Sequence, residues 1–312
     1  MGRYAAAVLV ALAGGVGAAR MLRALSAVVP PSQITAVVNT ADDIVLHGLH
    51  VSPDLDTVTY TLAGAINPET GWGLVDETWN AMASVERYGG ITWFRLGDRD
   101  LGTHLYRTQR LHEGAGLSTV TAEVAAAWGV EVRLLPMSDD RVETRLVVDE
   151  EEIGFQEYFV GRRHAVPVSA VRFDGAETAR PAPGVLESIA AAERIVVCPS
   201  NPIVSIGPLL AVPGIEHGVS SRREDVVAVS PIVAGAALKG PADRLLRELG
   251  HEPSVVGVAR LYAPFAATLV VDTADAELAA AVEAEGVRCV VCPTVMSSPE
   301  AAAALARQVL AA

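Results

Sequence analysis

The sequence predicts an α/β fold in which a doubly wound, Rossmann-like parallel sheet carries an inserted subdomain of mixed helices and strands. Three observations support this prediction. Short, continuously apolar runs rich in Val and Ile recur near the N-terminus and through the last third of the chain. Helical patterns separate the runs of the last third, and this alternation is typical of a parallel sheet covered on both faces. In the middle of the chain, helical patterns are followed by strand patterns with no helix between them.

Six segments have the pattern of a buried strand. In chain order they are residues 5–13, 34–39, 194–198, 225–229, 268–271 and 287–292. The predicted helices of the last third are residues 241–249, 275–285 and 299–310. We therefore expect residues 1–56 and 181–312 to form one nucleotide-binding domain built from both ends of the chain.

The middle of the chain predicts a second, inserted unit at residues 57–180. Its helical patterns cover residues 57–66, 77–88, 103–112 and 118–128. Its strand patterns cover residues 131–136, 142–149, 153–160 and 166–173. Because no helix separates these four strands, we expect residues 57–180 to be a mixed segment inserted into a doubly wound sheet that is made from both chain ends.

The composition limits the classes of function. The 312 residues carry a formal net charge of −13, which argues against general nucleic-acid binding because the phosphate backbone would repel the protein. Hydrophobic residues make up 51% of the chain, too many for a disordered one. Lys239 is the sole lysine, and the three cysteines are too few for a disulfide framework. A reducing, cytoplasmic setting fits this composition.

The uncharged run at residues 4–19 resembles a secretory signal, but its glycines predict a different structure. Sixteen residues are short of the roughly 20 that span a bilayer. Gly14, Gly15 and Gly17 interrupt the run, and residues 21–25 continue with helical periodicity. A strand, a glycine turn and a helix explain this pattern, and no later segment predicts a membrane span.

This glycine turn is the first candidate binding site. Gly14, Gly15 and Gly17 would let a phosphate approach the backbone, and the following helix would offer free N–H groups. It is not a Walker loop, because no Gly-Lys-Ser/Thr follows. A dinucleotide fingerprint would need a glycine where Arg20 stands. The alternative is a plain tight turn between strand and helix.

Acidic residues follow the second predicted strand. The run NTADD occupies residues 39–43, and SPDLDT occupies residues 52–57. Ligands of open α/β sheets bind beyond the carboxyl ends of the strands, so we expect Asn39 and Thr40 to contact a nucleotide. Carboxylates gathered there suit Mg²⁺, which prefers oxygen ligands. Alternatively, Asp54 or Asp56 caps the next helix.

Two further loops have polar residues in constrained positions. Ser200 and Asn201 stand between two prolines directly after a predicted strand, which suits hydrogen bonding to a base, ribose or phosphate. The run RLGDRD at residues 95–100 has alternating charges around a glycine and favours a solvated turn. Two tempting metal pairs, Cys289 with Cys292 and His47 with His50, lack the geometry or the partners of a zinc site.

Taken together, these motifs resemble the phospholactate transferase family of deazaflavin coenzyme F-420 biosynthesis. The matching blocks are LAGGVG at 12–17, NTADD at 39–43, SPDLDT at 52–57, LGDRD at 96–100, LPMSDD at 135–140 and PSNPIVSIG at 199–207. They occur in the family's order and extend over most of the chain. The position of Arg20 departs from the archaeal pattern, which is more Pro-Lys-like there.

The resemblance implies a transfer reaction. A phosphoester unit would pass from a guanosine-diphospho-linked donor to Fo, the deazariboflavin precursor, with release of GMP. The donor would carry 2-phospholactate or, as in many bacteria, phosphoenolpyruvate, and the enzyme would use Mg²⁺ and form a homodimer. The family pattern places Fo contacts on Asp56 and Arg95, within a pocket to which the insertion contributes.

A mechanism follows as a hypothesis from the motifs and the resemblance. Gly14–Gly17 together with Ser200 and Asn201 would hold the diphosphate. Asp43 or Asp56, rather than Asp42 or Asp54, would anchor Mg²⁺. Asp56 would accept the proton of the attacking hydroxyl, so Asp56→Ala would abolish turnover with the fold intact.

Two other classes remain as alternatives. A related family of nucleotide-sugar-binding regulators, without catalytic activity, shares the glycine turn and the NTADD type of strand end. The Ser-Pro-Asp-Leu-Asp-Thr run at residues 52–57 and the Leu-Gly-Asp-Arg-Asp run at residues 96–100 favour the transferase over this class. A Rossmann oxidoreductase is disfavoured because Asn39 stands where a ribose-binding acid is needed.

Overall fold

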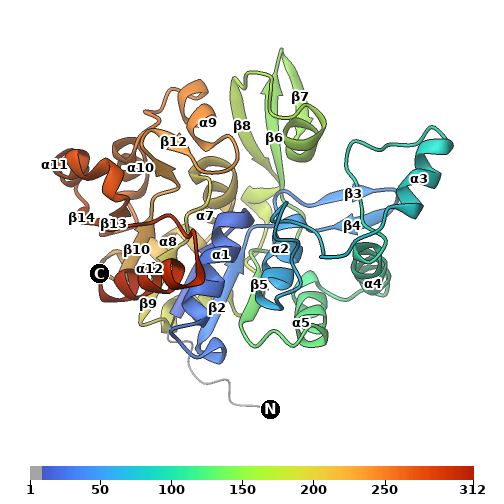
Figure 1. Ribbon diagram of the computed structural model, residues 1–312, viewed down its shortest axis with the longest axis horizontal. Helices are drawn as coiled ribbons and strands as arrows, with labels where there is room; N and C mark the ends of the chain where they lie inside the picture. The colour runs from blue at the N-terminus through green and yellow to red at the C-terminus, as the bar shows by residue number, and fades with distance from the viewer. Residues whose placement is uncertain (1–8) are drawn as a thin grey trace.

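A seven-stranded parallel sheet forms the centre of the molecule in the computed structural model, which describes residues 9–312 (Figure 1). Its strands are β1 (Leu9–Ala13), β2 (Ile34–Val38), β5 (Arg133–Pro136), β9 (Arg194–Val197), β10 (Val226–Val229), β13 (Thr268–Val271) and β14 (Arg288–Val291). Their order across the sheet is β14-β13-β10-β9-β1-β2-β5. The chain leaves β1 toward β2 on one side and returns to β9 on the other, so the winding reverses between β1 and β9.

The predicted doubly wound α/β class is confirmed. All six predicted strands lie in the sheet, although residues 5–8 of the first one fall outside the described residues. Alternate residues of each strand point to opposite faces: Val10 and Leu12 pack on one side, and Leu9 and Ala11 on the other. Both faces are buried, which explains why the strands are continuously apolar.

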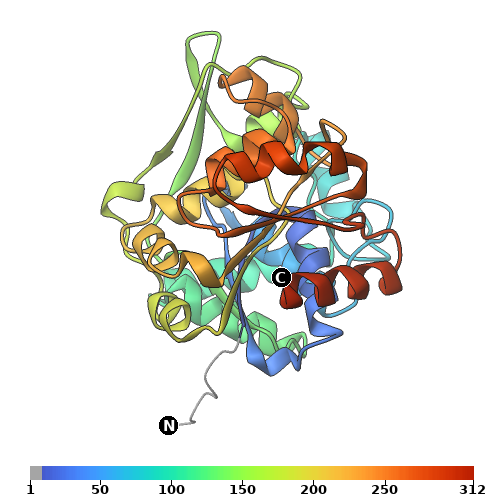
Figure 2. The same cartoon turned by 90° about the vertical axis from the view of Figure 1, so that its left-hand side faces the viewer.

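Helices cover each face of the sheet (Figures 1 and 2). One face carries α1 (Gly15–Ser26), α2 (Pro53–Leu62), α5 (Leu117–Ala127) and α12 (Pro299–Ala311). The other carries α6 (Val185–Ala191), α7 (Gly207–Ala211), α8 (Ile215–Ser220), α9 (Ala242–Glu248), α10 (Val255–Tyr262) and α11 (Ala279–Ala284). The C-terminal α12 packs beside the N-terminal α1, so both ends of the chain build one layer.

One strand of the predicted insertion belongs to the main sheet instead. β5 pairs in parallel with β2, with Leu134 opposite Ala36 and Leu135 opposite Val37. The division into residues 1–56 plus 181–312 and an insertion at 57–180 differs from the structure at this strand. The physical reason is that α5 precedes β5 and packs on it, so the chain returns through a helix and places β5 parallel to β2.

The remaining elements stand around the carboxyl edge of the sheet. They are the hairpin β3 (Ile44–Leu46) and β4 (Leu49–Val51), the helices α3 (Asn80–Arg87) and α4 (Asp100–His112), the antiparallel strands β6 (Glu143–Val148), β7 (Glu151–Gly154) and β8 (Ala170–Asp174), and the hairpin β11 (Ile232–Val233) and β12 (Ala236–Ala237). The predicted strand at 153–160 is wrong beyond Gly154. The chain turns helical there, because Phe155 and Tyr158 fill a core between β6 and α9.

None of the helices in residues 9–312 combines the length and the apolar character that crossing a bilayer requires.

Candidate functional site

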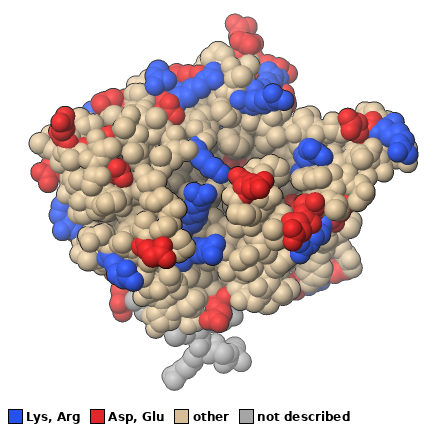
Figure 3. Space-filling model, viewed as in Figure 1, with Lys and Arg blue, Asp and Glu red and all other residues tan. Residues whose placement is uncertain are grey.

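A cavity of about 540 Å³ opens at the carboxyl edge of the sheet, beside the ends of the paired strands β1 and β9, between which the winding reverses. This is the switch point at which doubly wound sheets bind ligands, and the volume lies within the roughly 300–1,000 Å³ of small-molecule sites. The walls come from the turn after β1, the loops after β2, β9, β10 and β14, and the helices α2 and α4. Figure 3 shows this face hollowed near its centre, with basic side chains at the edge of the hollow.

The predicted glycine turn lies on the cavity floor. Gly14, Gly15 and Gly17 all line the cavity, and α1 begins directly at this turn. Gly15 has φ +73°, which favours glycine. A Cβ on Gly17 would lie 2.3 Å from the Pro199 carbonyl oxygen. Close packing against the 199–205 loop therefore explains part of the glycine pattern, while the N-terminus of α1 still opens onto the cavity.

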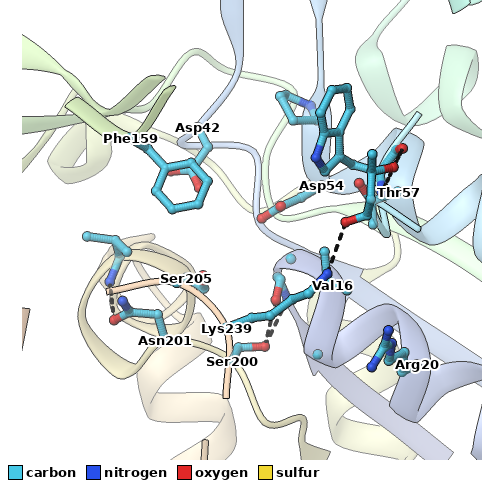
Figure 4. Close-up of a pocket in the computed structure, with 18 of the residues that line it drawn as sticks. Val16, Arg20, Asp42, Asp54, Thr57, Phe159, Ser200, Asn201, Ser205 and Lys239 are labelled. Carbon is cyan, nitrogen blue, oxygen red and sulfur yellow. Dashed lines mark hydrogen bonds between the residues drawn. The ribbon is translucent and has the colours of Figure 1, made fainter. Parts of the chain in front are cut away.

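Ser200 and Asn201 sit beside this turn, as predicted, and both line the cavity. The Ser200 hydroxyl accepts a hydrogen bond of 3.2 Å from the Gly14 N–H and donates one of 2.9 Å to the Gly14 carbonyl. The Asn201 Oδ1 accepts from the N–H groups of Ile203 and Val204 and caps the helical turn Pro202–Ile206. Ser200 therefore joins two loops at the switch point, while Asn201 fixes the shape of its own loop (Figure 4).

A pair of buried carboxylates, Asp42 and Asp54, faces the cavity above the glycine turn (Figure 4). Burial raises the pKa of Asp54 to about 6, against hydrogen bonds from Asn39 and the Gly15 N–H. Burial and the Asp54 charge raise the pKa of Asp42 well above its usual value. Asp42 Oδ1 has no hydrogen-bond partner among the described residues. The two carboxylates lack a counter-charge at this wall.

Two of the predicted nucleotide contacts lie behind this wall rather than on it. Asn39 and Thr40 are buried and do not line the cavity. Asn39 Nδ2 donates a hydrogen bond of 3.0 Å to Asp54 Oδ2, and its Oδ1 accepts from the Ala41 N–H. Asn39 therefore holds Asp54 in place, which is a role that a strand end can fill without touching a ligand.

The predicted metal pair, Asp43 and Asp56, is placed differently from the prediction. Asp43 does not line the cavity, and its carboxylate accepts a hydrogen bond of 2.6 Å from the Ser52 hydroxyl. Asp56 lines the cavity, but both its oxygens are engaged by the Arg107 guanidinium. Neither Asp54 nor Asp56 caps α2, since this helix begins at Pro53 and its N-cap is Ser52.

Sequence reasoning missed a set of residues on α4. Asp100, His104 and Arg107 lie on one face of this helix, turned toward α2. His104 Nδ1 is 3.7 Å from Asp56 Oδ2, and His104 Nε2 is 3.2 Å from Asp100 Oδ2. The available signal was the three-residue spacing of His104 and Arg107 on the predicted helix at residues 103–112; Asp100 stood outside it, in the predicted turn. Ligand atoms of Asp56, Asp100 and His104 lie within 4.8 Å of one another, as a metal site needs, although Arg107 already neutralises Asp56.

In the turn before α4, residues 95–99, only the first residue, Arg95, is a predicted ligand contact, and the others connect α3 with α4. Asp98 accepts from the N–H groups of Asn80 and Ala81 at the start of α3. Glu77 accepts in turn from the N–H groups of Arg99 and Asp100 at the start of α4. Arg95, the predicted Fo contact, lines the cavity, and its guanidinium stacks 4.4 Å above the ring of Trp79.

Two basic residues on the cavity wall were not among the predicted ligand contacts. Arg20 projects from α1, and Lys239 from the loop after β12, as Figure 4 shows. Lys239 Nζ donates a hydrogen bond of 2.9 Å to the Thr70 carbonyl. Burial and the nearby Arg20 charge lower the pKa of Lys239. Neither residue forms an ion pair with a carboxylate in the part of the chain that the structure describes.

This arrangement defines a class. The fold is that of the doubly wound α/β proteins, and the switch-point cavity, with a helix N-terminus and two unpaired cations, suits a phosphorylated small molecule. The family model for the 2-phospho-L-lactate transferase CofD matches residues 9–308. The chain belongs to this family of transferases, which confirms the resemblance seen in its motifs.

Relatives and solved structures agree with the assignment. The chain is 51% identical over 310 residues to a phosphoenolpyruvate transferase of Kitasatospora aureofaciens, with 97% of each protein covered. It is 41% identical over 312 residues to one of Mycolicibacterium smegmatis, with 95% of each covered. A crystal structure of a UPF0052 family member from Bacillus halodurans has the same fold, at a TM-score of 0.64 and 18% identity, covering 97% of this chain and 98% of that one.

Proposed function

We propose that this protein transfers a phosphoenolpyruvyl group from a guanosine-diphospho-linked donor to the terminal ribityl hydroxyl of Fo (7,8-didemethyl-8-hydroxy-5-deazariboflavin) in coenzyme F-420 biosynthesis. The hydroxyl oxygen forms a bond to the distal phosphorus of the donor. The bond from that phosphorus to the bridging oxygen breaks, and GMP leaves. The relatives named phosphoenolpyruvate transferases support this donor over one that carries 2-phospho-L-lactate.

The observation that carries the proposal is that one cavity is lined by a helix N-terminus, by basic side chains and by buried carboxylates. The α1 N-terminus, Arg20 and Lys239 offset the charge of the donor diphosphate. A protein with a net charge of −13 needs such local positive charge to hold an anionic substrate. Ser200 keeps the loop after β9 against the glycine turn, so that both loops face the same ligand.

The Mg²⁺ that the family resemblance implies fits one pair of carboxylates. Asp42 and Asp54 are buried, line the cavity and face no cation among the described residues. Oδ1 of Asp42 lacks a hydrogen-bond partner there, as does Oδ1 of Asp43, but Asp43 does not line the cavity. These are the properties of ligands for a hard divalent cation. We therefore assign the metal to Asp42 and Asp54, in place of Asp43 and Asp56. When bound, the ion would neutralise diphosphate charge and favour departure of GMP.

The acceptor end of the cavity combines aromatic surface with a fixed carboxylate. Trp72, Phe94 and Phe159 line the cavity and offer apolar faces to the deazaflavin ring. Arg95 lines it as well and is held by Trp79. Asp56 accepts the proton of the attacking hydroxyl or a hydrogen bond from it, which orients the oxygen for attack.

The test is direct product analysis. The purified protein is incubated with Fo, Mg²⁺ and guanosine-diphospho donors that carry phosphoenolpyruvate or 2-phospho-L-lactate, and products are identified by mass spectrometry. We expect phosphoenolpyruvyl-Fo and GMP in equal amounts, with much less product from the lactate donor and none after chelation of Mg²⁺. Absence of any Fo adduct with either donor would refute the proposal.

The setting of the reaction is part of the same proposal. We propose that the protein acts in the cytoplasm as a homodimer, with small molecules and no nucleic acid or membrane as its partners. Analytical ultracentrifugation of the purified protein measures the oligomeric state, and a single species at the monomer mass of 32.6 kDa would contradict the dimer.

A further inference from the structure

The interface between α2 and α4 buries a charged pair beside the cavity. The side chains of Asp56 and Arg107 are 7% and 3% exposed, and they come from positions 51 residues apart. Arg107 Nη1 donates to Asp56 Oδ2 at 3.2 Å, while Nη2 donates to Oδ1. The guanidinium therefore fixes both the position and the plane of the carboxylate.

Further contacts hold the guanidinium itself. Arg107 Nη1 lies 3.3 Å from the His50 carbonyl oxygen and 3.3 Å from His104 Nδ1. About two turns earlier on α4, Asp100 accepts a hydrogen bond of 2.6 Å from the Tyr60 hydroxyl, which belongs to α2. Charged and polar side chains thus link the two helices at both places, and the side chains of His104 and Arg107 are buried.

Stability alone gives little reason for this arrangement. A buried ion pair repays its desolvation poorly, and an apolar pair of similar volume is often as stable or more so. The position of the pair suggests another reason. Asp56 lines the cavity, whereas Arg107 stands behind it and does not. Arg107 reaches the cavity through two residues that line it, Asp56, which it holds by both oxygens, and His104.

We propose that Arg107 is a positioning residue, which keeps the Asp56 carboxylate oriented toward the acceptor substrate. This inference rests on the proposed function, because it assumes that Asp56 meets the attacking hydroxyl of Fo. A carboxylate has about four acceptor sites, and Arg107 occupies two of them, so acceptor capacity remains for the hydroxyl. A misplacement of about 1 Å of such a group costs on the order of 100-fold in rate.

The first experiment compares two arginines of the same helix. Arg107→Met removes the guanidinium, and Arg110→Met removes a surface one that pairs with Glu113 and Glu123. We expect Arg107→Met to lower kcat by about 100-fold and weaken Fo binding, with the KM for the donor within about threefold of wild type. Arg107→Lys should recover part of kcat, since it keeps the charge but not the two-point contact. Arg110→Met should behave as wild type.

A double-mutant cycle separates positioning from folding. If Arg107 acts through Asp56, then Asp56→Asn with Arg107→Met is no less active than Asp56→Asn alone, whereas independent roles would multiply the two losses. The double variant leaves no unpaired buried charge, so it serves even if Arg107→Met alone does not fold. Fo affinity, measured by fluorescence titration, is a second readout at every corner of the cycle.

The outcomes distinguish this inference from the proposed function. Wild-type protein that neither binds Fo nor forms product refutes both. Active wild type with Arg107→Met at Arg110→Met levels refutes the positioning role alone. A kcat loss that is accompanied by an equal rise in the donor KM, or losses that multiply in the cycle, would also overturn it, because both indicate a general structural defect.

Discussion

Two groups of buried aspartates lie on one cavity wall, and they differ in how their charge is met. Asp56 is paired with Arg107 and flanked by His104, so its charge is met within the protein. Asp42 and Asp54 come shortly before Asp56 in the chain, yet they face no cation among the described residues. Burial raises the pKa of both, and Asp54 adds its own charge to Asp42.

The difference indicates different roles for residues of one type. A carboxylate that is already paired is a fixed acceptor of known orientation, which suits contact with a hydroxyl group. Carboxylates that are desolvated and unpaired need a proton or an external cation. The comparison therefore separates the substrate-orienting group from the metal ligands, although the sequence presents all of them as one acidic cluster.

Asp56→Ala tests the paired group and should have the largest effect. We expect turnover to fall by more than about 1,000-fold, as for loss of a positioned base. Contrary to the expectation of an undisturbed fold, stability should also fall by about 3–5 kcal/mol, because Arg107 would keep a buried charge without a partner. Steady-state kinetics and urea denaturation measure the two effects. Unchanged stability would mean that the pair is not formed in solution.

Asp54→Asn tests the unpaired group. The amide has nearly the same shape but no charge, so Mg²⁺ affinity should fall by more than about 100-fold, since even residues that only support a metal ligand are worth 10–100-fold. Isothermal titration with Mg²⁺ in the presence of GDP gives the affinity. Asp43→Asn is the matched control, because Asp43 lies outside the cavity and should change Mg²⁺ binding little.

The pH dependence of stability separates the two groups without a substrate. The pKa of Asp54 is about 6 in the folded protein against an ordinary value of 3.8, so the folded state retains this proton as the pH rises from 4 to 6 and the unfolded state does not. The contribution of Asp54 to the free energy of unfolding is therefore full below about pH 4 and falls by about 3 kcal/mol as the pH rises to 6.

The measurement is a difference between variants. Urea denaturation of wild type and Asp54→Asn in EDTA, from pH 4.5 to 7.5, should show wild type losing stability relative to the variant as the pH rises. Excess Mg²⁺ at pH 7.5 should restore the wild type. Parallel curves for the two proteins would indicate that Asp54 titrates normally and would weaken its assignment as a metal ligand.

Lys239→Gln tests a cation that lines the same cavity, and this substitution should have the smallest effect. Its ammonium group is partly exposed and already donates to Thr70, so we expect the KM for the donor to rise about tenfold, which corresponds to ~1.4 kcal/mol. The effect should shrink at high salt, while kcat stays near wild type. A change in the KM for Fo instead would place the two substrates the other way round.

Much of the fold was predictable because it depends on local pattern. Strands that are buried on both faces must be apolar throughout, which is why β1, β9 and β10 were found from their residues. The β3–β4 hairpin was not found, since its two strands have three residues each and its turn uses a left-handed histidine, His47. Short strands on the rim carry too little periodic signal.

The sequence by itself determined that a glycine turn, an acidic strand end and a proline-flanked Ser-Asn pair would meet at one edge of a sheet, because parallel strands bring their carboxyl ends together. It also determined the family, through motifs in a fixed order. Only the tertiary structure decided which aspartate is paired and which sheet β5 joins. Those outcomes depend on how α4 contacts α2 and on how α5 returns the chain to β2. Residues that are distant in the chain bury these groups, and such burial leaves no local sequence pattern that would predict the outcome.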